Sequence, residues 1–386
     1  MTQHPVNDTC MRTADAARDA NAWVEVDARR FEQNLARVRA QVAQRTRICV
    51  VMKADAYGAG ISMLMSAIIE ARIPCVGVTS NREARQARDC GFTGQLLRLR
   101  GATIDEMVAA MDCGVEEMLG NLDTARQLAE RARNGKRIVN FHLALNAGEM
   151  AHNALTVNDE LGRRQALEIL ALGGLRPVGI MTHFASTDVA QVHAGLAQFE
   201  RDALDLVVRA GLERNDITLH AANSWLTLHV PHSHLDMVRP GRALYGFSPH
   251  DDFHKVVSFK TRVAGINAYP AGSGVSYGHR GVLQRDSRLA YVPVGYSDGY
   301  RRIFGNRGQV LIRGHRAPIV GAVTMNGFAV DVTDCPDAQI GDEVVLFGRQ
   351  GPDEITESEA QGLMNDIVVD MSTAWSRLHS TVAAQH

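Results

Sequence analysis

Short runs of apolar and β-branched residues alternate with longer helix-type segments between residues 45 and 246. The short runs have the length of buried strands, and the longer segments have the spacing of helices that bury one face. The strands that this pattern predicts are Ile48–Lys53, Cys75–Ser80, Gln95–Arg100, Val115–Leu119, Ile138–Asn146, Val178–His183, Ile217–Asn223 and Asp236–Arg239. The helices expected between them include Ile61–Arg72, Asn81–Cys90, Leu122–Arg133 and Val189–Ala210.

Eight strands with intervening helices are the number that closes a parallel (β/α)8 barrel of the TIM type. An open, doubly wound sheet is the alternative fold. Such sheets often carry a GxGxxG sequence after the first strand, and this chain has none there. We therefore expect an α/β barrel domain over residues 30–246.

The hydrophobic pattern changes after Gly246. Turn-rich segments such as PAGSG and RQGPDE now separate short β-type runs, which are Val256–Ile266, Leu289–Val294, Val310–Ile312, Phe328–Val332 and Glu343–Phe347. This pattern predicts a second, mostly β domain over residues 247–386, which strand 22–28 is expected to join. Residues 1–21 are polar and alanine-rich, and we expect them to form a flexible extension.

The composition is that of a soluble globular protein, since 45% of the 386 residues are apolar and 22% are charged. Basic and acidic side chains number 41 and 43, whereas a nucleic-acid-binding protein usually has a basic excess. No stretch approaches the roughly 18 apolar residues of a membrane span. An enzyme or a small-molecule binder is expected, without nucleic acid or membrane as a partner.

The first twenty residues contain no apolar segment typical of a secretory signal. We expect a cytoplasmic protein if the chain is complete, and a periplasmic one if a leader has been removed. The six cysteines form no CxxC pair, so no metal site is expected, and most of them should be small core residues.

Reactive side chains follow several predicted strands at the end where barrel enzymes place their chemistry. The first strand ends in Lys53, and the sixth, seventh and eighth strands deliver His183, Asn223–Ser224 and Arg239. Burial at the end of an apolar strand lowers the pKa of a lysine, as an imine-forming amine requires. The structural alternative is a lysine that extends to solvent at the barrel rim.

The turn that follows Arg239 has the features of an anion site. Gly241 permits close approach of the backbone, and the hydroxyls of Ser224 and Tyr57 could add donors for a phosphate. Phosphate sites in barrels favour the last two strands. Each of these pieces is also a common loop sequence, and a single histidine such as His183 is often structural.

The predicted β domain holds motifs that physical reasoning alone does not assign to a function. Tyr277 lies between glycines in GVSYG, and Tyr296 belongs to the tyrosine-rich segment YVPVGYSDGYRR. Met325 and Asn326 precede a β-type run. The structural interpretation is ordinary packing at a domain rim.

Together, these motifs resemble the alanine racemase family. The matching segments run from Trp23 to about Asp331 and occur in the family's order: KADAYG (53–58), MTHF (181–184), HAANS (220–224), MVRPGRALYG (237–246), VSYG (275–278), VGYSDGYRR (294–302) and GAVTMN (321–326). The resemblance implies a pyridoxal 5'-phosphate barrel with a β domain, in a head-to-tail homodimer with shared active sites.

The resemblance also implies roles for individual residues. Lys53 would carry the cofactor, and Arg239 would hydrogen-bond its pyridine nitrogen. Tyr277 would come from the partner subunit and act opposite Lys53 across the cofactor plane. The other residues so placed are Tyr57, His183, Asn223, Ser224, Gly241 and Arg242 at the cofactor, and His152, Met325, Asn326 and Tyr296 at the substrate.

Racemisation removes a proton from one face of a planar carbanion and returns one to the other face, so it needs two bases. Lys53 and Tyr277 would supply them. An arginine against the pyridine nitrogen does not give up its proton, which leaves the ring a weaker electron sink and suppresses side reactions.

Departures from the strict alanine racemases favour the broad-specificity branch of the family. Ala144 stands where those enzymes have a lysine, and Asn326 stands in place of an aspartate. Both changes are expected to widen the pocket. His152 replaces an arginine common to both branches, which predicts weak carboxylate binding. The broad-specificity branch also has a cysteine pair that resembles Cys49 and Cys75.

The expected function is therefore a racemase for several amino acids, among them Lys, Arg, Met and Ala. The alternatives are an alanine-specific racemase, a barrel decarboxylase that uses the same cofactor, and a degenerate relative that only binds pyridoxal phosphate. The decarboxylase is disfavoured because its glycine-rich phosphate loop is absent from this sequence.

Overall fold

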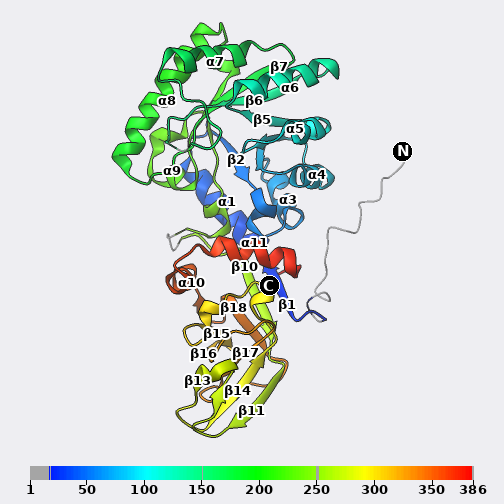
Figure 1. Ribbon diagram of the computed structural model, residues 1–386, viewed down its shortest axis with the longest axis vertical. Coiled ribbons are helices and arrows are strands. Elements are labelled where there is room, and N and C mark those ends of the chain that lie inside the picture. The colour runs from blue at the N-terminus through cyan, green and yellow to red at the C-terminus, as the bar shows by residue number, and fades with distance from the viewer. Residues whose placement is uncertain (1–16, 18, 150, 249–251, 385–386) are drawn as a thin grey trace, which may run out of the picture. The chain divides into compact units, whose positions relative to one another are not determined.

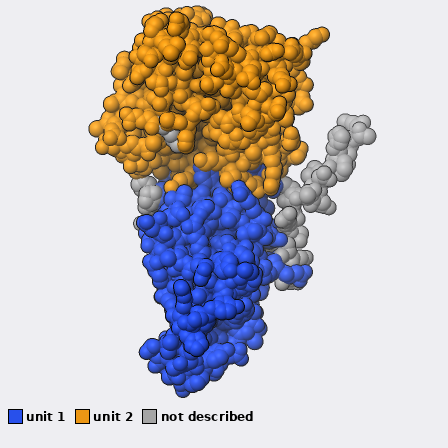
Figure 2. Space-filling view, in the orientation of Figure 1, with its two compact units in different colours: residues 1–32, 57–64, 245–386 blue, residues 33–56, 65–244 orange. Residues whose placement is uncertain are grey.

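The computed structural model describes residues 17, 19–149, 151–248 and 252–384. The chain divides into two compact units, which are coloured separately in Figure 2. The barrel unit comprises residues 33–56 and 65–244, and the β unit comprises residues 1–32, 57–64 and 245–386. Most of the predicted N-terminal extension, residues 1–16 and 18, lies outside the described part of the chain.

The barrel unit contains an eight-stranded parallel sheet with the strand order β8-β7-β6-β5-β4-β3-β2-β9 (Figure 1). Its strands are β2 (Arg47–Val51), β3 (Cys75–Val78), β4 (Gln95–Arg98), β5 (Val115–Leu119), β6 (Val139–Ala144), β7 (Leu175–Met181), β8 (Thr218–His220) and β9 (Met237–Val238). Backbone hydrogen bonds from Asp236 N to Leu219 O (3.1 Å) and from Arg239 N to Ala222 O (2.8 Å) bring the two ends of the sheet together. The predicted barrel is confirmed, and the open sheet is wrong.

Helices connect the strands, as the alternating pattern predicts. They are α1 (Ala28–Gln41), α2 (Lys53–Tyr57), α3 (Ile61–Glu70), α4 (Asn81–Asp89), α5 (Ile104–Ala110), α6 (Leu122–Asn134), α7 (Glu160–Ala171), α8 (Val189–Arg209) and α9 (Ser224–His229). Helix α6 shows why they form: Asn121 caps it, and Ala125, Leu128, Ala129 and Ala132 bury one face. Short 3₁₀ helices span 111–113, 214–216, 231–234, 242–245, 277–279, 296–298 and 302–304.

The β unit is built on one long, mostly antiparallel sheet with the order β11-β14-β17-β16-β15-β18-β10-β1-β20. Its strands are β1 (Ala22–Val26), β10 (Val257–Arg262), β11 (Gly265–Tyr269), β14 (Ser287–Val292), β15 (Gln309–Ile312), β16 (His315–Val320), β17 (Phe328–Asp331), β18 (Glu343–Gln350) and β20 (Ser380–Ala383). Strand β19 (Asp353–Ile355) pairs with β18, and β12 (Gly274–Val275) pairs with β13 (Gly281–Val282).

Strand β1 lies far from the rest of this sheet in sequence. It pairs antiparallel with β10, with Val24 opposite Phe259, and parallel with β20, with Val24 opposite Thr381. Val24 is fully buried. The apolar residues of AWVEV, which are buried at four of the five positions, thus complete the sheet of the β unit.

Two helices of the β unit, α10 (Glu357–Met364) and α11 (Val368–Leu378), and strand β20 were not predicted. Helix α10 begins with a capping box between Thr356 and Glu359. Helix α11 carries Trp375, which is fully buried and stacks on Phe259 of β10 with ring centroids 4.6 Å apart. The C-terminal segment therefore supplies much of the unit's aromatic core.

Cys49 of β2 and Cys75 of β3 lie opposite each other in register, and both are buried free thiols. A hydrogen bond with Cys49, together with burial, raises the pKa of the Cys75 thiol. In this structure the two residues pack with Leu97 and Met237 in a small apolar cluster.

Candidate active site

Lys53 lies two residues beyond β2, at the start of α2, rather than within the strand as predicted. The chain turns sharply there, because Ala54, Asp55, Ala56 and Tyr57 all have φ values between 53° and 56°. Left-handed conformation costs a residue with a Cβ roughly 1–2 kcal/mol. A hydrogen bond from Ala56 N to Met52 O (2.8 Å) helps to hold this turn.

The surroundings of Lys53 favour its neutral amine. Its side chain keeps access to solvent, yet partial desolvation lowers the pKa of Lys53, and the positive charge of Arg242 lowers it further. Glu83 acts in the opposite direction. The net lowering is the change that a nucleophilic or basic lysine requires.

Arg239 is buried and stands at one end of a chain of hydrogen bonds through the barrel interior. Its Nη1 lies 2.7 Å from His220 Nδ1, His220 Nε2 lies 2.8 Å from His142 Nδ1, and His142 Nε2 lies 2.9 Å from Glu116 Oε2. A guanidinium only donates, so each histidine accepts at Nδ1 and donates from Nε2. The chain therefore runs in one direction, from the Arg239 cation to the Glu116 carboxylate.

The pKa shifts of His220, Arg239 and Glu116 agree with a chain that runs from the cation to the carboxylate. Burial lowers the pKa of His220, the Arg239 charge lowers it further, and the ring is therefore neutral. Burial also lowers the pKa of Arg239, to about 10, so the guanidinium stays charged at neutral pH. Burial alone would raise the pKa of Glu116, but the hydrogen bond with His142, together with Asn140 and the charge of Arg47, lowers the pKa.

Gly179 makes room for this chain. A Cβ built at Gly179 would lie 2.1 Å from His142 Nδ1, so no larger residue fits beside the ring.

Glu116, His142 and His220 were not predicted from the sequence as site residues. The signal was present, because both histidines interrupt apolar strands, in FHLAL and TLHAA.

His183 follows β7 at the same end of the barrel, with its Nδ1 3.5 Å from Arg239 Nη2. The ring is reached by solvent, but partial desolvation and the charge of Arg239 lower the pKa of His183 to about 4, and Lys53 and His152 act in the same direction. His183 is therefore neutral at physiological pH. His152 itself is exposed in the loop after β6.

The turn after β9 gathers hydrogen-bond donors around Ser224. Ser224 Oγ accepts from Gly241 N (2.8 Å) and from Ala243 N (3.3 Å), and Arg242 lies between these two residues. Asn223 caps helix α9, because its Oδ1 accepts from Leu226 N (3.0 Å). The structure thus brings together the predicted residues of the last two strands.

The remaining predicted residues belong to the β unit. Asn326 Nδ2 donates to Ser297 Oγ (2.8 Å), and Ser297 Oγ donates to Met325 O (2.8 Å), which joins Met325 and Asn326 to the turn that holds Tyr296. Tyr277 is 81% exposed in a 3₁₀ turn that follows Ser276, a residue with φ 65°.

Tyr57 differs from these exposed residues, because its ring is buried. The ring stacks on Tyr245 at a centroid distance of 4.7 Å, and the Tyr57 carbonyl accepts from Ser372 Oγ (3.0 Å). A Cβ built at the next residue, Gly58, would lie 2.3 Å from Ser372 O, so this close approach requires glycine.

Ala144 is only 2% exposed and packs with Met118 and Met181. The wider pocket expected at this position stays a prediction. Among the described residues, no three His, Cys, Asp or Glu side chains form a metal-type cluster, and no helix is both long and apolar enough to cross a membrane.

Models of one protein family match nearly the whole chain. Residues 26–249 match the model of the alanine racemase N-terminal domain, and residues 256–382 match that of the C-terminal domain. A broad specificity amino-acid racemase of Pseudomonas taetrolens is 49% identical over 360 residues, which cover 93% of this chain and 88% of the relative. A lysine racemase of Proteus mirabilis is 41% identical over 94% of this chain and 89% of its own length.

A solved structure shares the fold. The alanine racemase of Bartonella henselae with covalently bound pyridoxal phosphate superposes with a TM-score of 0.79 at 24% identity, over 95% of this chain and 100% of that one. The family models, the level of identity to the curated racemases and the barrel with its β unit agree. The chain belongs to the alanine racemase family.

Proposed function

We propose that the protein is a pyridoxal-phosphate-dependent amino-acid racemase of broad specificity that works as a homodimer. One observation carries the proposal: Lys53, an amine with a lowered pKa, stands at the strand-end face of the barrel unit that also holds the buried Arg239. The relatives named as broad specificity and lysine racemases support the same activity.

The residues of the barrel unit fit such a cofactor. Lys53 supplies an amine for an aldehyde, and Arg239 supplies a charged donor for a pyridine nitrogen. The Ser224 hydroxyl, whose oxygen accepts from the N–H groups of Gly241 and Ala243, supplies a donor for a phosphate. Neutral His183 suits contact with an aromatic ring.

When bound, pyridoxal phosphate withdraws electrons from the α-carbon of the amino acid and makes its α-proton removable. Lys53 Nζ accepts or returns that proton on one face, which the lowered pKa of Lys53 favours. The Tyr277 hydroxyl of the partner subunit serves the other face. The hydrogen-bond chain behind Arg239 holds the guanidinium in place as a permanent donor.

Exposed apolar side chains on the β unit support a shared site. Tyr277 is 81% exposed, Met325 54% and Tyr296 42%. Large exposed apolar side chains that gather in one region are typical of an interaction surface. In the proposed dimer, Tyr277 and Met325 complete the site of the other subunit.

Substrate breadth is proposed from Asn326 and from the named relatives. Asn326 is neutral and donates to Ser297, so it places no negative charge beside the arriving side chain. The buried apolar surroundings of Ala144 leave no place for a charged lysine. Positively charged, polar and apolar side chains should therefore all be accepted.

One assay tests the proposed function. The protein loaded with pyridoxal phosphate is incubated with L-Lys, L-Arg, L-Met and L-Ala, and each enantiomer is followed by chiral chromatography. D-isomers of several substrates should accumulate without release of CO2. Turnover of alanine alone would identify an alanine-specific racemase, and CO2 release would identify a decarboxylase.

A second experiment tests the shared site. Tyr277→Phe should lower racemase activity about 10²–10⁴-fold, because one of the two bases is lost. Mixing Lys53→Ala subunits with Tyr277→Phe subunits should restore part of the activity, since one hybrid site keeps both bases. Verified mixed dimers without any recovery would contradict the shared site.

A further inference from the structure

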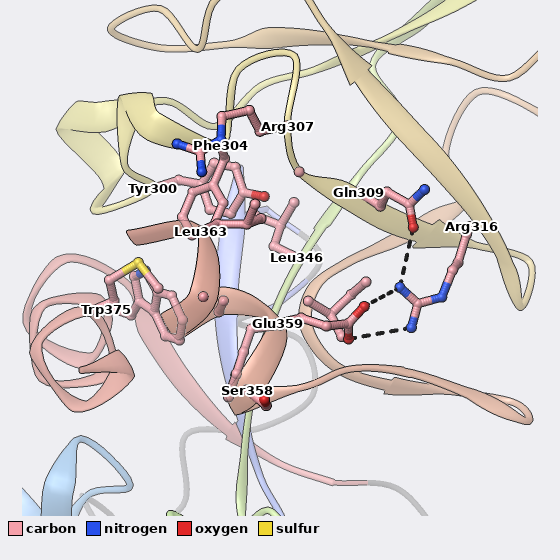
Figure 3. Close-up of a pocket in the computed structure, with 16 residues that line it drawn as sticks. Tyr300, Phe304, Arg307, Gln309, Arg316, Leu346, Ser358, Glu359, Leu363 and Trp375 are labelled. Carbon is pink, nitrogen blue, oxygen red and sulfur yellow. Dashed lines mark hydrogen bonds and ion pairs between the residues drawn. The ribbon is translucent and has the colours of Figure 1, made fainter. Parts of the chain in front are cut away.

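The β unit contains a cavity of about 360 Å³ that is separate from all residues assigned above to the racemase site (Figure 3). It lies among the 3₁₀ turn 302–304, strands β15 and β18, and helices α10 and α11. Its wall is mainly apolar and includes Phe304, Leu346, Phe347, Leu363, Met371 and Trp375. Cavities of this size and lining are typical of small-molecule sites.

The hydroxyl of Tyr300 is the unusual feature of this wall. Tyr300 is only 2% exposed, and its ring stacks between Phe304 (4.7 Å) and Phe328 (5.2 Å). In Figure 3 its oxygen points into the cavity. The hydroxyl makes no hydrogen bond to any described residue.

Burial raises the pKa of Tyr300, so its hydroxyl keeps the proton and can act as a donor. The packed rings on both sides fix the direction of this donor. A ligand in the cavity would therefore meet one rigid hydrogen-bond donor beside an apolar surface. Such a donor selects a ligand that carries an acceptor.

The charged residues at the rim leave one positive charge uncompensated. Arg316 is already bound to Asp353 and Glu359, with N–O distances of 2.8 and 2.6 Å. Arg307 lies one turn after Phe304, its backbone N–H donating to Phe304 O (3.1 Å). Its guanidinium has no ion pair or hydrogen bond within the described chain.

We propose that this cavity binds a small aromatic carboxylate. The ring would occupy the apolar space beside Phe304 and Leu363, and the carboxylate would accept from the Tyr300 hydroxyl and pair with Arg307. One hydroxyl and one guanidinium match the two oxygens of a carboxylate, whereas a phosphate would call for more donors. The proposal does not depend on the racemase activity.

The test is isothermal titration of the protein loaded with pyridoxal phosphate, with 2-naphthoate as the probe. The matched cation, 2-naphthylmethylammonium, has a similar apolar body. Naphthoate should bind at least tenfold more tightly than the cation. Tyr300→Phe removes only the hydroxyl and should weaken naphthoate binding about three- to tenfold. Arg307→Gln should weaken it about two- to fivefold and reduce the preference for the anion.

Two further variants separate this site from others. Tyr269→Phe is the matched control, because Tyr269 is 42% exposed on β11 and does not line the cavity. It should leave naphthoate binding unchanged. Gly362 lines the cavity, and a Cβ there would meet no atom within 4 Å, so Gly362→Leu can narrow the opening without a clash and should reduce binding.

Racemase activity and thermal unfolding show whether each variant is folded. Absence of naphthoate binding to the unmodified protein would overturn the proposal. So would equal binding of the cation and the anion. Binding that none of Tyr300→Phe, Arg307→Gln and Gly362→Leu weakens would place the probe elsewhere and would also overturn it.

Discussion

The hydrogen-bond chain behind Arg239 predicts a specific effect of removing one distant charge. Glu116→Gln keeps an acceptor for His142 Nε2 but removes the carboxylate that balances the buried Arg239 cation. Without that charge the orientation of both histidines is less strongly favoured. We therefore expect the variant to lose stability and to bind pyridoxal phosphate more weakly.

The structure sets the size of the effect. Glu116 is 6% exposed, and its contact with His142 is 2.9 Å long. A buried hydrogen bond to a charged group contributes about 1.5–3 kcal/mol. Glutamine retains part of this interaction, so we expect the free energy of unfolding to fall by about 2 kcal/mol.

The neighbouring residue provides a matched control. Glu117 is 1% exposed on the same strand and binds Arg98 through two hydrogen bonds, of 2.6 and 3.1 Å. Glu117→Gln should therefore cost a similar free energy of unfolding. Glu117 makes no hydrogen bond or ion pair with His142, His220 or Arg239, so the substitution should leave cofactor binding unchanged.

The assay combines urea unfolding with titration of the cofactor. Both variants should show a lower midpoint of unfolding, and only Glu116→Gln should raise the dissociation constant of pyridoxal phosphate and alter its visible absorbance. If both variants change cofactor binding equally, the effect comes from general loss of stability. A directed hydrogen-bond chain from Arg239 to Glu116 that controls cofactor binding would then be refuted.

Four further predictions follow from other features of the site. Borohydride reduction should fix the cofactor on the peptide that contains Lys53, and label on Lys136 or Lys255 instead would contradict the assignment. His183 has a folded pKa of about 4 and an unfolded pKa of about 6.5, so unfolded chains bind more protons between these values and stability should fall as pH decreases from 6.5 to 4. His183→Gln should flatten this dependence in pH-dependent unfolding experiments, and an unchanged slope would count against the shift. His152→Arg should lower the KM for several amino acids, because arginine makes a two-pronged contact with a carboxylate; a higher KM for every substrate would show the expectation to be wrong. Ala54→Gly should raise the free energy of unfolding by about 0.5–1 kcal/mol, because glycine tolerates φ 53° without strain; a loss of stability would show that the Ala54 side chain matters more.

The barrel could be predicted because many of its strands are short, largely apolar runs. All four residues of β3 (CVGV) are buried, so here the sequence pattern directly reflects burial on both faces. Burial of whole strands also made part of the site difficult to predict. Glu116, His142 and His220 are polar residues inside such strands, and their spacing along the chain does not reveal that they form one chain of hydrogen bonds.

Other features depend on tertiary packing that no local pattern encodes. The left-handed run Ala54–Tyr57 contains no glycine, so nothing in ADAY indicates positive φ. Helix α10 did carry a recognisable start in Thr356 and Glu359. Helix α11 is harder to predict, since it owes its place to Trp375 packing on Phe259.

The position of β1 in the sheet has a consequence for synthesis of the protein. Residues 22–26 leave the ribosome early, yet their partners β10 and β20 begin at residues 257 and 380. At about 5–20 residues per second, β1 waits roughly 20–70 s for β20 to be made. Until then the edge of β1 that pairs with β20 stays open, and other chains could pair with it. The sheet of the β unit can therefore be completed only after translation has passed β20, and a nascent chain that stalls earlier exposes this strand edge to aggregation.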